Sequence, residues 1–245
     1  MSSAKQIIIL QIFLITGSDA IASQSGDLWI EESTANGITV WTRQNQEGGL
    51  VSYRAKTQIN APIKDVFAVL YDGQHKSQLL ENSASYEVLD IHSKTEFTIY
   101  NQVNMNSLFI SNRDIVFKTA IEFDPHNHTI TARFWNVNHP LKPPTDGIVR
   151  IEECKGMWQV QWRSNNSTLL TYEVEVDPGG WLPIWLVNYS NRTIPRKTIE
   201  NMRRQVAHQE LYTKSHKILS KHFEFFSELG LKSPTNSPSP PSPEE

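Results

Sequence analysis

The sequence predicts an α+β fold in which a curved antiparallel β-sheet is covered by a long C-terminal α-helix. Between residues 86 and 176 the chain reads as a succession of strands, and several alternate apolar with polar residues, as in "WQVQW" at 158–162. Such alternation is typical of a sheet with one covered face. After Pro183 the apolar spacing becomes helical and stays so to about Leu229. This last helix is the only predicted element long enough to cover the sheet.

The first part of the domain reads as a hairpin followed by helices. Two strand-like runs, at 37–44 and 50–60, flank the turn "NQEGG". Pro62 then stands near the start of a helical segment at 61–75, and a second short helical piece is expected around residues 76–81. The first helix should bury one face, because helical spacing relates Val66, Phe67, Val69 and Leu70.

Turn residues separate the strands of the main sheet. The predicted strands span residues 86–91, 95–104, 113–123, 129–137, 147–153, 157–163 and 169–176. "DPGG" at 177–180 then ends the last strand, and we expect Trp181 and Trp185 to fill the gap between sheet and helix. In the final helix Pro195 marks a fresh start, and the apolar-poor stretch 207–216 predicts a kink or a frayed middle.

The chain divides into three parts. Residues 1–22 carry a lysine, an apolar run and an A-x-A pattern that ends at Ala22, which is typical of a secretory signal peptide. We therefore expect an exported protein, periplasmic or secreted. Residues 23–230 are expected to form one domain, and the Pro- and Ser-rich residues 231–245 a disordered tail. The single cysteine, Cys154, cannot form an intramolecular disulfide bond, so the core must hold the fold.

The charge balance and the motifs exclude several classes of protein. Lys and Arg number 23 against 26 Asp and Glu, a formal net charge of −3, which argues against a nucleic-acid partner. The histidines lack metal-ligand spacing and no nucleophile or phosphate-binding motif is found, so no metal, cofactor or catalytic residue is predicted. Basic residues outnumber acidic ones between residues 192 and 222. That face either rests transiently on an anionic membrane surface or is merely solvated.

Two motifs carry a resemblance to a known family. The order of elements, "SNRDIV" at 111–116 and "DPGGWLPIWLVN" at 177–188 resemble the START lipid-transfer domains, a helix-grip family, over roughly residues 30–228. The resemblance implies that sheet and last helix enclose a hydrophobic tunnel. It also implies a lipid or another hydrophobic small molecule as the single ligand of the tunnel, and we expect a monomer.

The resemblance also implies the residues that line the tunnel. Strand parity would turn Arg113, Ile115, Phe117 and Thr119 inward, and Tyr100 would join them from the preceding strand. The expected ligand-binding set is completed by four tryptophans, Trp135, Trp158, Trp181 and Trp185. Tyr100 and Thr119 are neutral where steroid-binding relatives bury an acidic and a basic residue, and Lys76 falls near a cationic position that contacts phosphate in the phosphatidylcholine carrier. The resemblance therefore leaves the ligand open.

Arg113 has two readings. Its guanidinium would suit the phosphate or carboxylate of a ligand, or it is satisfied by backbone carbonyls and fixes the loop before its strand. Asp114 must point to the other face, because successive residues of a strand alternate.

Three functions follow from these observations. The first is a carrier that shields or transfers one hydrophobic ligand without chemistry. The second is a helix-grip enzyme, cyclase-like or hydrolase-like, that acts on a small apolar substrate and would need an acid or base in the tunnel. The third is a protein-binding module, which would have a packed core and no tunnel.

Overall fold

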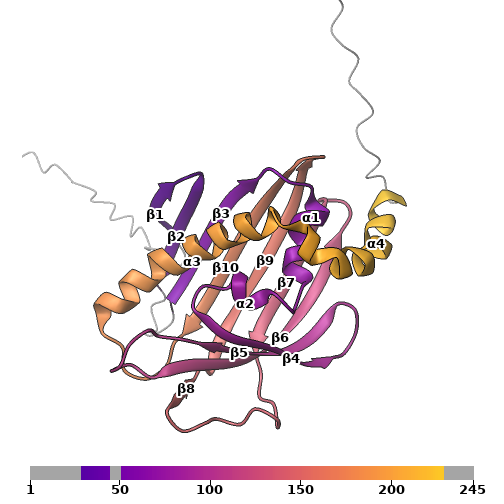
Figure 1. Cartoon of the computed structure of the whole chain (residues 1–245). Coiled ribbons are helices and arrows are strands. Elements are labelled where there is room, and N and C mark those ends of the chain that lie inside the picture. The colour runs from indigo at the N-terminus through magenta and orange to yellow at the C-terminus, as the bar shows by residue number, and fades with distance from the viewer. Residues whose placement is uncertain (1–28, 45–50, 229–245) are drawn as a thin grey trace, which may run out of the picture.

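The computed structural model describes residues 29–44 and 51–228, and a ten-stranded sheet forms its centre (Figure 1). Along the sheet the strand order is β1-β2-β3-β10-β9-β7-β6-β5-β4, and β8 pairs with β6. The strands are β1 (Ile30–Ala35), β2 (Ile38–Gln44), β3 (Val51–Ile59), β4 (Ser83–Ile91), β5 (Glu96–Val103), β6 (Asn112–Asp124), β7 (Thr129–Asn136), β8 (Ile148–Arg150), β9 (Glu153–Ser164) and β10 (Ser167–Asp177).

Among the described strands the β6–β8 pair is parallel and the other pairs are antiparallel. The first three strands join the last one in the middle of the sheet, because β3 pairs with β10 over its whole length. The sheet curls around its concave face, with the helices on that side (Figure 1).

The helices are α1 (Ile63–Tyr71), α2 (Lys76–Leu79), α3 (Ile184–Val206), the 3₁₀ turn η1 (Gln209–Tyr212) and α4 (Thr213–Glu228). The long helix α3 crosses the sheet and packs on β2 and β3, while α4 packs against α1 (Figure 1). The predicted fold class, α+β with a curved antiparallel sheet and a C-terminal helix over it, is confirmed. All the predicted strands and both helical pieces before β4 are present.

One strand was not predicted. β1 pairs with β2 through a turn at Asn36 and Gly37, whose φ angles of 53° and 67° are both positive. An Asn-Gly pair is the preferred sequence for a two-residue hairpin turn, since both residues tolerate a positive φ. The signal was therefore present in the sequence, directly before the strand predicted at 37–44.

The C-terminal helix is interrupted, as the apolar-poor stretch 207–216 predicted. α3 ends at Val206 and the chain resumes through η1 into α4. The expectation that Pro195 marks a fresh start is wrong, because Pro195 lies inside α3. A proline at this position removes one backbone donor, yet its ring is buried and the helix continues on both sides.

The core lies where α1 and α3 press on the sheet. From α3, Ile199, Met202 and Val206 are buried on one stripe, and from α1 the buried residues include Val66 and Phe67. Burying each of these side chains fully stabilises the fold by about 1.5–3 kcal/mol. The core therefore fixes α3 over β2 and β3, and the remaining concave face of the sheet is left to the cavity described below.

The predicted signal peptide (1–22) and the predicted tail (231–245) lie outside the described residues, as do the ends of the expected domain 23–230. Within the described part of the chain, none of the helices combines the length and the apolar character that crossing a membrane requires.

Candidate functional site: a cavity between sheet and helices

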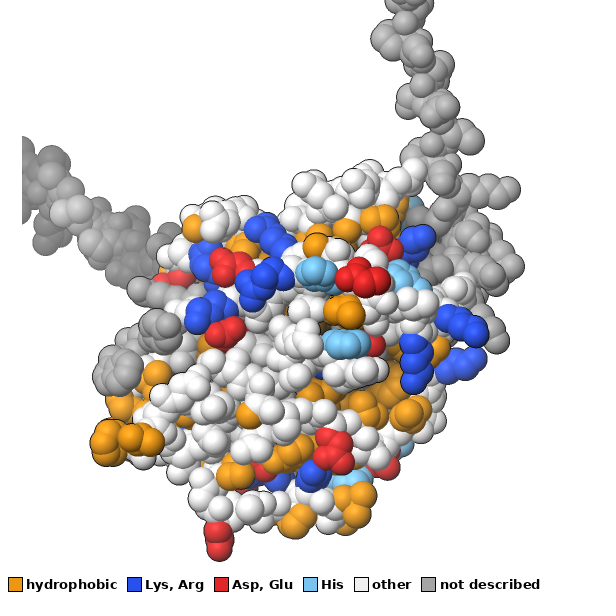
Figure 2. All heavy atoms as spheres, in the orientation of Figure 1, with side chains coloured by type: hydrophobic (Ala, Val, Ile, Leu, Met, Phe, Trp, Pro, Cys, Tyr) orange, Lys and Arg blue, Asp and Glu red, His pale blue; other side chains and the backbone are white. Residues whose placement is uncertain are grey.

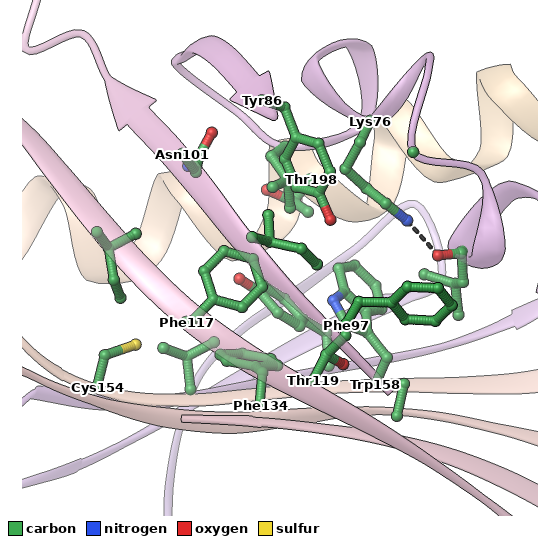
Figure 3. Close-up of a pocket in the computed structure, with 18 of the residues that line it drawn as sticks. Lys76, Tyr86, Phe97, Asn101, Phe117, Thr119, Phe134, Cys154, Trp158 and Thr198 are labelled. Carbon is green, nitrogen blue, oxygen red and sulfur yellow. Dashed lines mark hydrogen bonds between the residues drawn. The ribbon is translucent and has the colours of Figure 1, made fainter. Parts of the chain in front are cut away.

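A cavity of about 910 Å³ lies between the concave face of the sheet and the helices (Figure 3). Its floor is supplied by strands β3 to β7, β9 and β10, and residues of the helices α1 to α4 complete its wall. Most lining side chains are apolar, among them Phe97, Ile99, Phe117, Phe134 and Trp158. Ligand pockets of proteins commonly measure about 300–1,000 Å³ and have walls of this kind.

Strand β6 turns the predicted side chains toward the cavity. Arg113, Ile115, Phe117 and Thr119 all line it, and so does Trp158 from β9. The parity that the resemblance implied for this strand is therefore right. Thr119 uses its hydroxyl locally, because Oγ1 donates to the carbonyl of Arg133 at 3.0 Å. Whether these residues contact a ligand stays a prediction.

The prediction that Tyr100 faces the cavity is wrong. Residues that stand opposite each other in an antiparallel ladder share a face, and Phe117 stands opposite Ile99 while Tyr100 stands opposite Val116. Tyr100 therefore points to the outer face, where Nζ of Lys142 lies 4.4 Å from the centre of its ring. The residues of β5 that line the cavity are Phe97, Ile99, Asn101 and Val103.

The other tryptophans also depart from the prediction. Trp135 is 38% exposed and points away from the cavity, because its neighbours Phe134 and Ala132 alternate with it and line the wall. Trp181 is 79% exposed, so it does not fill the gap between sheet and helix; Leu182 lines the cavity there instead. The side chain of Trp185 lies outside the described part of the structure.

The guanidinium of Arg113 binds backbone carbonyls. Nε donates to Pro178 at 3.3 Å, and the two Nη atoms donate to Ser111 at 2.5 Å and to Gly179 at 3.0 Å. The side chain is 2% exposed, and burial lowers its pKa from the ordinary arginine value. Of the two readings of Arg113, the geometry matches the structural one: the charge braces the loop before β6 against the turn that follows β10.

Asp114 points the opposite way, as strand alternation requires. Its carboxylate receives two hydrogen bonds from Arg150, at 2.7 and 3.0 Å, and both partners are buried. Such a bidentate pair satisfies both charges away from water. The Arg-Asp motif is thus two separate braces, one on each face of the sheet.

Three charged side chains reach the cavity wall near α2. Lys76 is buried, and its Nζ donates to the carbonyls of Val69 at 3.3 Å and of Leu70. Asp72 accepts from the backbone N–H of His75 and from Ser215, at 2.7 and 3.2 Å. Glu81 faces Nζ of Lys197 at 3.1 Å.

These three residues differ in how far their charge is compensated. Both carboxylates have partners on both oxygens, since Asp72 also contacts the ring of His75 and Glu81 also accepts from Asn201. Lys76 has only neutral carbonyls as hydrogen-bond partners, and burial lowers its pKa to about 7, while the charge of Asp72 acts in the other direction. Sequence reasoning missed both carboxylates because no motif marks them.

Burial also acts on the neutral polar groups of the wall. It raises the pKa of Cys154 to about 12 and the pKa of the tyrosines Tyr53 and Tyr172, whose ring centres lie 5.9 Å apart. These groups are therefore uncharged at neutral pH. In the described part of the chain no cluster of three His, Cys, Asp or Glu is placed to hold a metal ion.

The sequence from residue 19 to residue 215 matches the family model of the START domain. The chain belongs to the START domain family. Among curated sequences, it is 25% identical over 175 residues to an uncharacterized protein of Pseudomonas aeruginosa, a match that covers 71% of this chain and 85% of that protein. It is 24% identical over 171 residues to the phosphatidylcholine transfer protein of Bos taurus, covering 68% and 78% of the two chains.

Solved START structures share the fold. A fragment of a STAR-related lipid transfer protein from Xanthomonas axonopodis superposes with a TM-score of 0.66 and 29% identity, over 74% of this chain and 99% of that one. Human STARD10 superposes with a TM-score of 0.67 and 20% identity, over 82% and 80%. The first of these supports a comparison of sites, and the second supports the fold alone.

Several cavity residues of this START domain were not predicted. Phe134 and Ala132 could have been found from the alternation of β7, because Trp135 and Phe134 cannot both face inward. Predicting that Ile99 and Asn101 face the cavity requires the pairing register of β5 and β6, which cannot be read from the sequence. Asp72 and Glu81 lie beside short helices, where the spacing of apolar residues does not identify the side that faces the cavity.

Proposed function

We propose that this START domain binds one hydrophobic ligand, lipid or sterol-like, in its cavity and shields it or moves it between membranes. The observation that carries the proposal is the cavity itself, which has a volume of about 910 Å³ and a mainly apolar wall. The similarity to a phosphatidylcholine transfer protein and to a lipid transfer protein of known structure supports the same conclusion.

Binding of an acyl chain or a ring system in such a cavity draws on the hydrophobic effect. Each buried methylene contributes about 0.8 kcal/mol, so a long chain is retained strongly and the protein must open to release it. The segment 181–195, between the end of β10 and the middle of α3, is our choice for the opening element, because Leu182, Ser190 and Ile194 line the cavity there.

Release to a membrane needs a surface that lipid accepts, and we place that surface at the same end of the cavity. Leu108 and Phe109, in the loop between β5 and β6, are 98% and 96% exposed, and Trp181 is nearly as exposed. Arg113 joins this loop to the turn at 177–180, and the nearby Met105 and Leu182 line the cavity. Apolar and aromatic tips of this kind favour insertion at the boundary of headgroups and acyl chains.

The basic face of the last helix is a weaker choice for membrane contact. Arg203 donates to Asn36 and Gly37, and Arg196 donates to Ser33 and Ala35, so both hold the β1–β2 hairpin. Figure 2 shows basic and acidic side chains mixed over the region of α3, while hydrophobic side chains lie lower on the same face, toward β4 and β5. The apolar loop is therefore the surface that the proposal assigns to the bilayer.

We also propose that the protein is exported, on the pattern of residues 1–22. The membranes that it serves would then lie outside the cytoplasm.

A vesicle assay tests the function. Donor vesicles of phosphatidylcholine carry a fluorescent phosphatidylcholine in one arm and a fluorescent sterol in the other, and the purified full chain is added with unlabelled acceptor vesicles. We expect the chain to accelerate transfer of at least one probe above its spontaneous rate. Replacing Leu108 and Phe109 by serine should slow transfer while probe binding is retained, and Ile30→Ser, on the exposed face of the edge strand β1, should leave both unchanged. Lack of acceleration of both probes would contradict the proposal.

A further inference from the structure

The amine of Lys76 is a buried group that the proposed carrier function does not use. Lys76 begins α2 and its side chain extends into the cavity, where it borders the same space as Tyr86 and Phe97 (Figure 3). The residue is only 8% exposed, so the amine is accessible mainly from within the cavity.

The hydrogen bonds of Lys76 leave the amine one free direction. Its two acceptors are the carbonyls of Val69 and Leu70, at the C-terminal end of α1. A neutral amine has two N–H bonds and one lone pair in a tetrahedral arrangement. When the two N–H bonds are held by these two carbonyls, the lone pair is left for the remaining direction, away from the end of α1.

The charges around Lys76 do not hold it as an ion pair. Asp72 is the charged group that acts on it, but the carboxylate of Asp72 is already shared between His75 and Ser215. Within the described residues no carboxylate oxygen forms a salt bridge with Nζ of Lys76. The titratable groups that border the cavity with it are Tyr53, Tyr71, Asp72, Glu81, Tyr86, Lys94, Arg113, Cys154, Tyr172 and Lys214.

The effect of burial on this amine therefore outweighs the opposing charge of Asp72. It lowers the pKa of Lys76 to about 7, whereas an exposed lysine titrates near 10.4. At neutral pH the uncharged fraction of Lys76 is then on the order of 10³ larger than that of an exposed lysine. An uncharged lysine in an apolar pocket is the form that attacks carbonyl carbon.

We propose that Lys76 is a covalent site for ligands with a carbonyl group, long-chain aldehydes in particular, which it holds as an imine. Nζ adds to the carbonyl carbon, the carbonyl oxygen leaves as water with the two protons of the amine, and a C=N bond replaces the C=O bond. Hydrolysis reverses the step and releases the ligand. The proposal rests on the proposed function in one respect, namely that the apolar chain of the ligand lies in the cavity.

The test traps the imine by reduction. The full chain is incubated with dodecanal and sodium cyanoborohydride at pH 7, and the intact mass and the modified peptides are measured by mass spectrometry. We expect one dodecyl group per chain, on Lys76, formed at least about 10-fold faster than on the exposed Lys56. Lys76→Arg keeps a cation that cannot form an imine and should lose this adduct, while Lys56→Arg should keep it.

A second probe separates this proposal from the carrier function. Dodecanol has the same chain without the carbonyl, and its binding is measured on the wild type and on Lys76→Arg by displacement of a fluorescent fatty alcohol. If dodecanol binds and the aldehyde adduct is absent, scattered over surface lysines, or found on Lys94 or Lys214, the covalent site is wrong and the carrier function stands. If neither probe binds, both proposals fail. Because the adduct is mapped on the wild type, the result does not depend on the variant folding.

Discussion

Arg113 shows how a single buried charge can hold two loops together. Its three hydrogen bonds end on carbonyls from two segments, Ser111 before β6 and Pro178 and Gly179 after β10. Hydrogen bonds to charged groups are worth about 1.5–3 kcal/mol, and a buried charge that loses its acceptors costs more.

Replacing Arg113 by lysine tests this role. The single ammonium group of a lysine cannot donate to all three carbonyls that the planar guanidinium of Arg113 reaches. We therefore expect the free energy of unfolding to fall by about 2–4 kcal/mol in urea denaturation. The matched control is Arg133→Lys on the exposed face of β7, where the ion pair with Glu122 is solvated and the change should stay within about 0.5 kcal/mol. Equal effects of the two substitutions would contradict the structural role of Arg113.

Gly156 of β9 lies close to its two neighbouring strands, to the backbone of β10 and to the cavity residue Phe134 of β7. A Cβ at this position would lie 2.3 Å from the carbonyl oxygen of Glu173 and 2.5 Å from the ring of Phe134. Because the first of these is backbone, the clash cannot be relieved by a rotamer change alone. We expect Gly156→Ala to destabilise the fold by about 1–3 kcal/mol and to move Phe134 in the cavity, as thermal unfolding and a crystal structure would report. A variant as stable as the wild type would show that the strands have room to separate.

Lys76 makes the stability of the protein depend on pH. Its pKa is lowered in the folded state, so between about pH 7 and pH 10 the unfolded chain binds more protons than the folded chain. The contribution of Lys76 to stability therefore rises with pH in this range, on the order of 1.4 kcal/mol per unit, and is constant below it. The difference in unfolding free energy between wild type and Lys76→Met, measured in urea from pH 6 to pH 9.5, should increase only above pH 7. A constant difference would mean that the amine is not buried.

After the break at the end of α3, side-chain contacts hold η1 and α4 in place. η1 joins α3 to α4 at Tyr212, which is buried, packs edge-on against His75 at 5.7 Å and donates its hydroxyl to Gln205 at 2.5 Å. α4 is further tied to the end of α1 by Ser215 and Asp72.

Removing this anchor should loosen α4 locally. Tyr212→Ala deletes a buried aromatic ring, a change that costs about 3–5 kcal/mol, and we expect faster hydrogen exchange in η1 and α4 with less change in α3. Leu211→Ala, one residue away and largely exposed, should leave the exchange pattern as it is. Uniformly faster exchange over the whole molecule would show that α4 unfolds only with the rest.

At the scale of helices and strands, the sequence predicted the features that depend on apolar periodicity and on turn residues. Alternation located the strands of the main sheet, and the absence of apolar positions located the break after α3. The residues of β6 that face the cavity were predicted correctly, because the position of Arg113 fixed which side chains of that strand point inward. The prediction failed at Tyr100, because its facing depends on the pairing of Ile99 with Phe117, and at Trp181, because a loop after two glycines at positive φ has no period.

For the whole molecule, the central claim is that sheet and helices stand apart far enough to leave an apolar cavity for one ligand. Ala132 lines that cavity from β7, and Ala120 on β6 is turned to the other face, where it stands opposite Arg133. Ala132→Trp should therefore fill part of the cavity, and Ala120→Trp should leave the cavity unchanged.

The most direct measurement is native mass spectrometry of the full chain after incubation with phospholipid vesicles, for the wild type and these two variants. We predict one bound hydrophobic molecule per chain in the wild type and in Ala120→Trp, and its loss or marked reduction in Ala132→Trp. A bare wild-type mass, or the same bound molecule in all three proteins, would contradict the claim that the cavity holds the ligand.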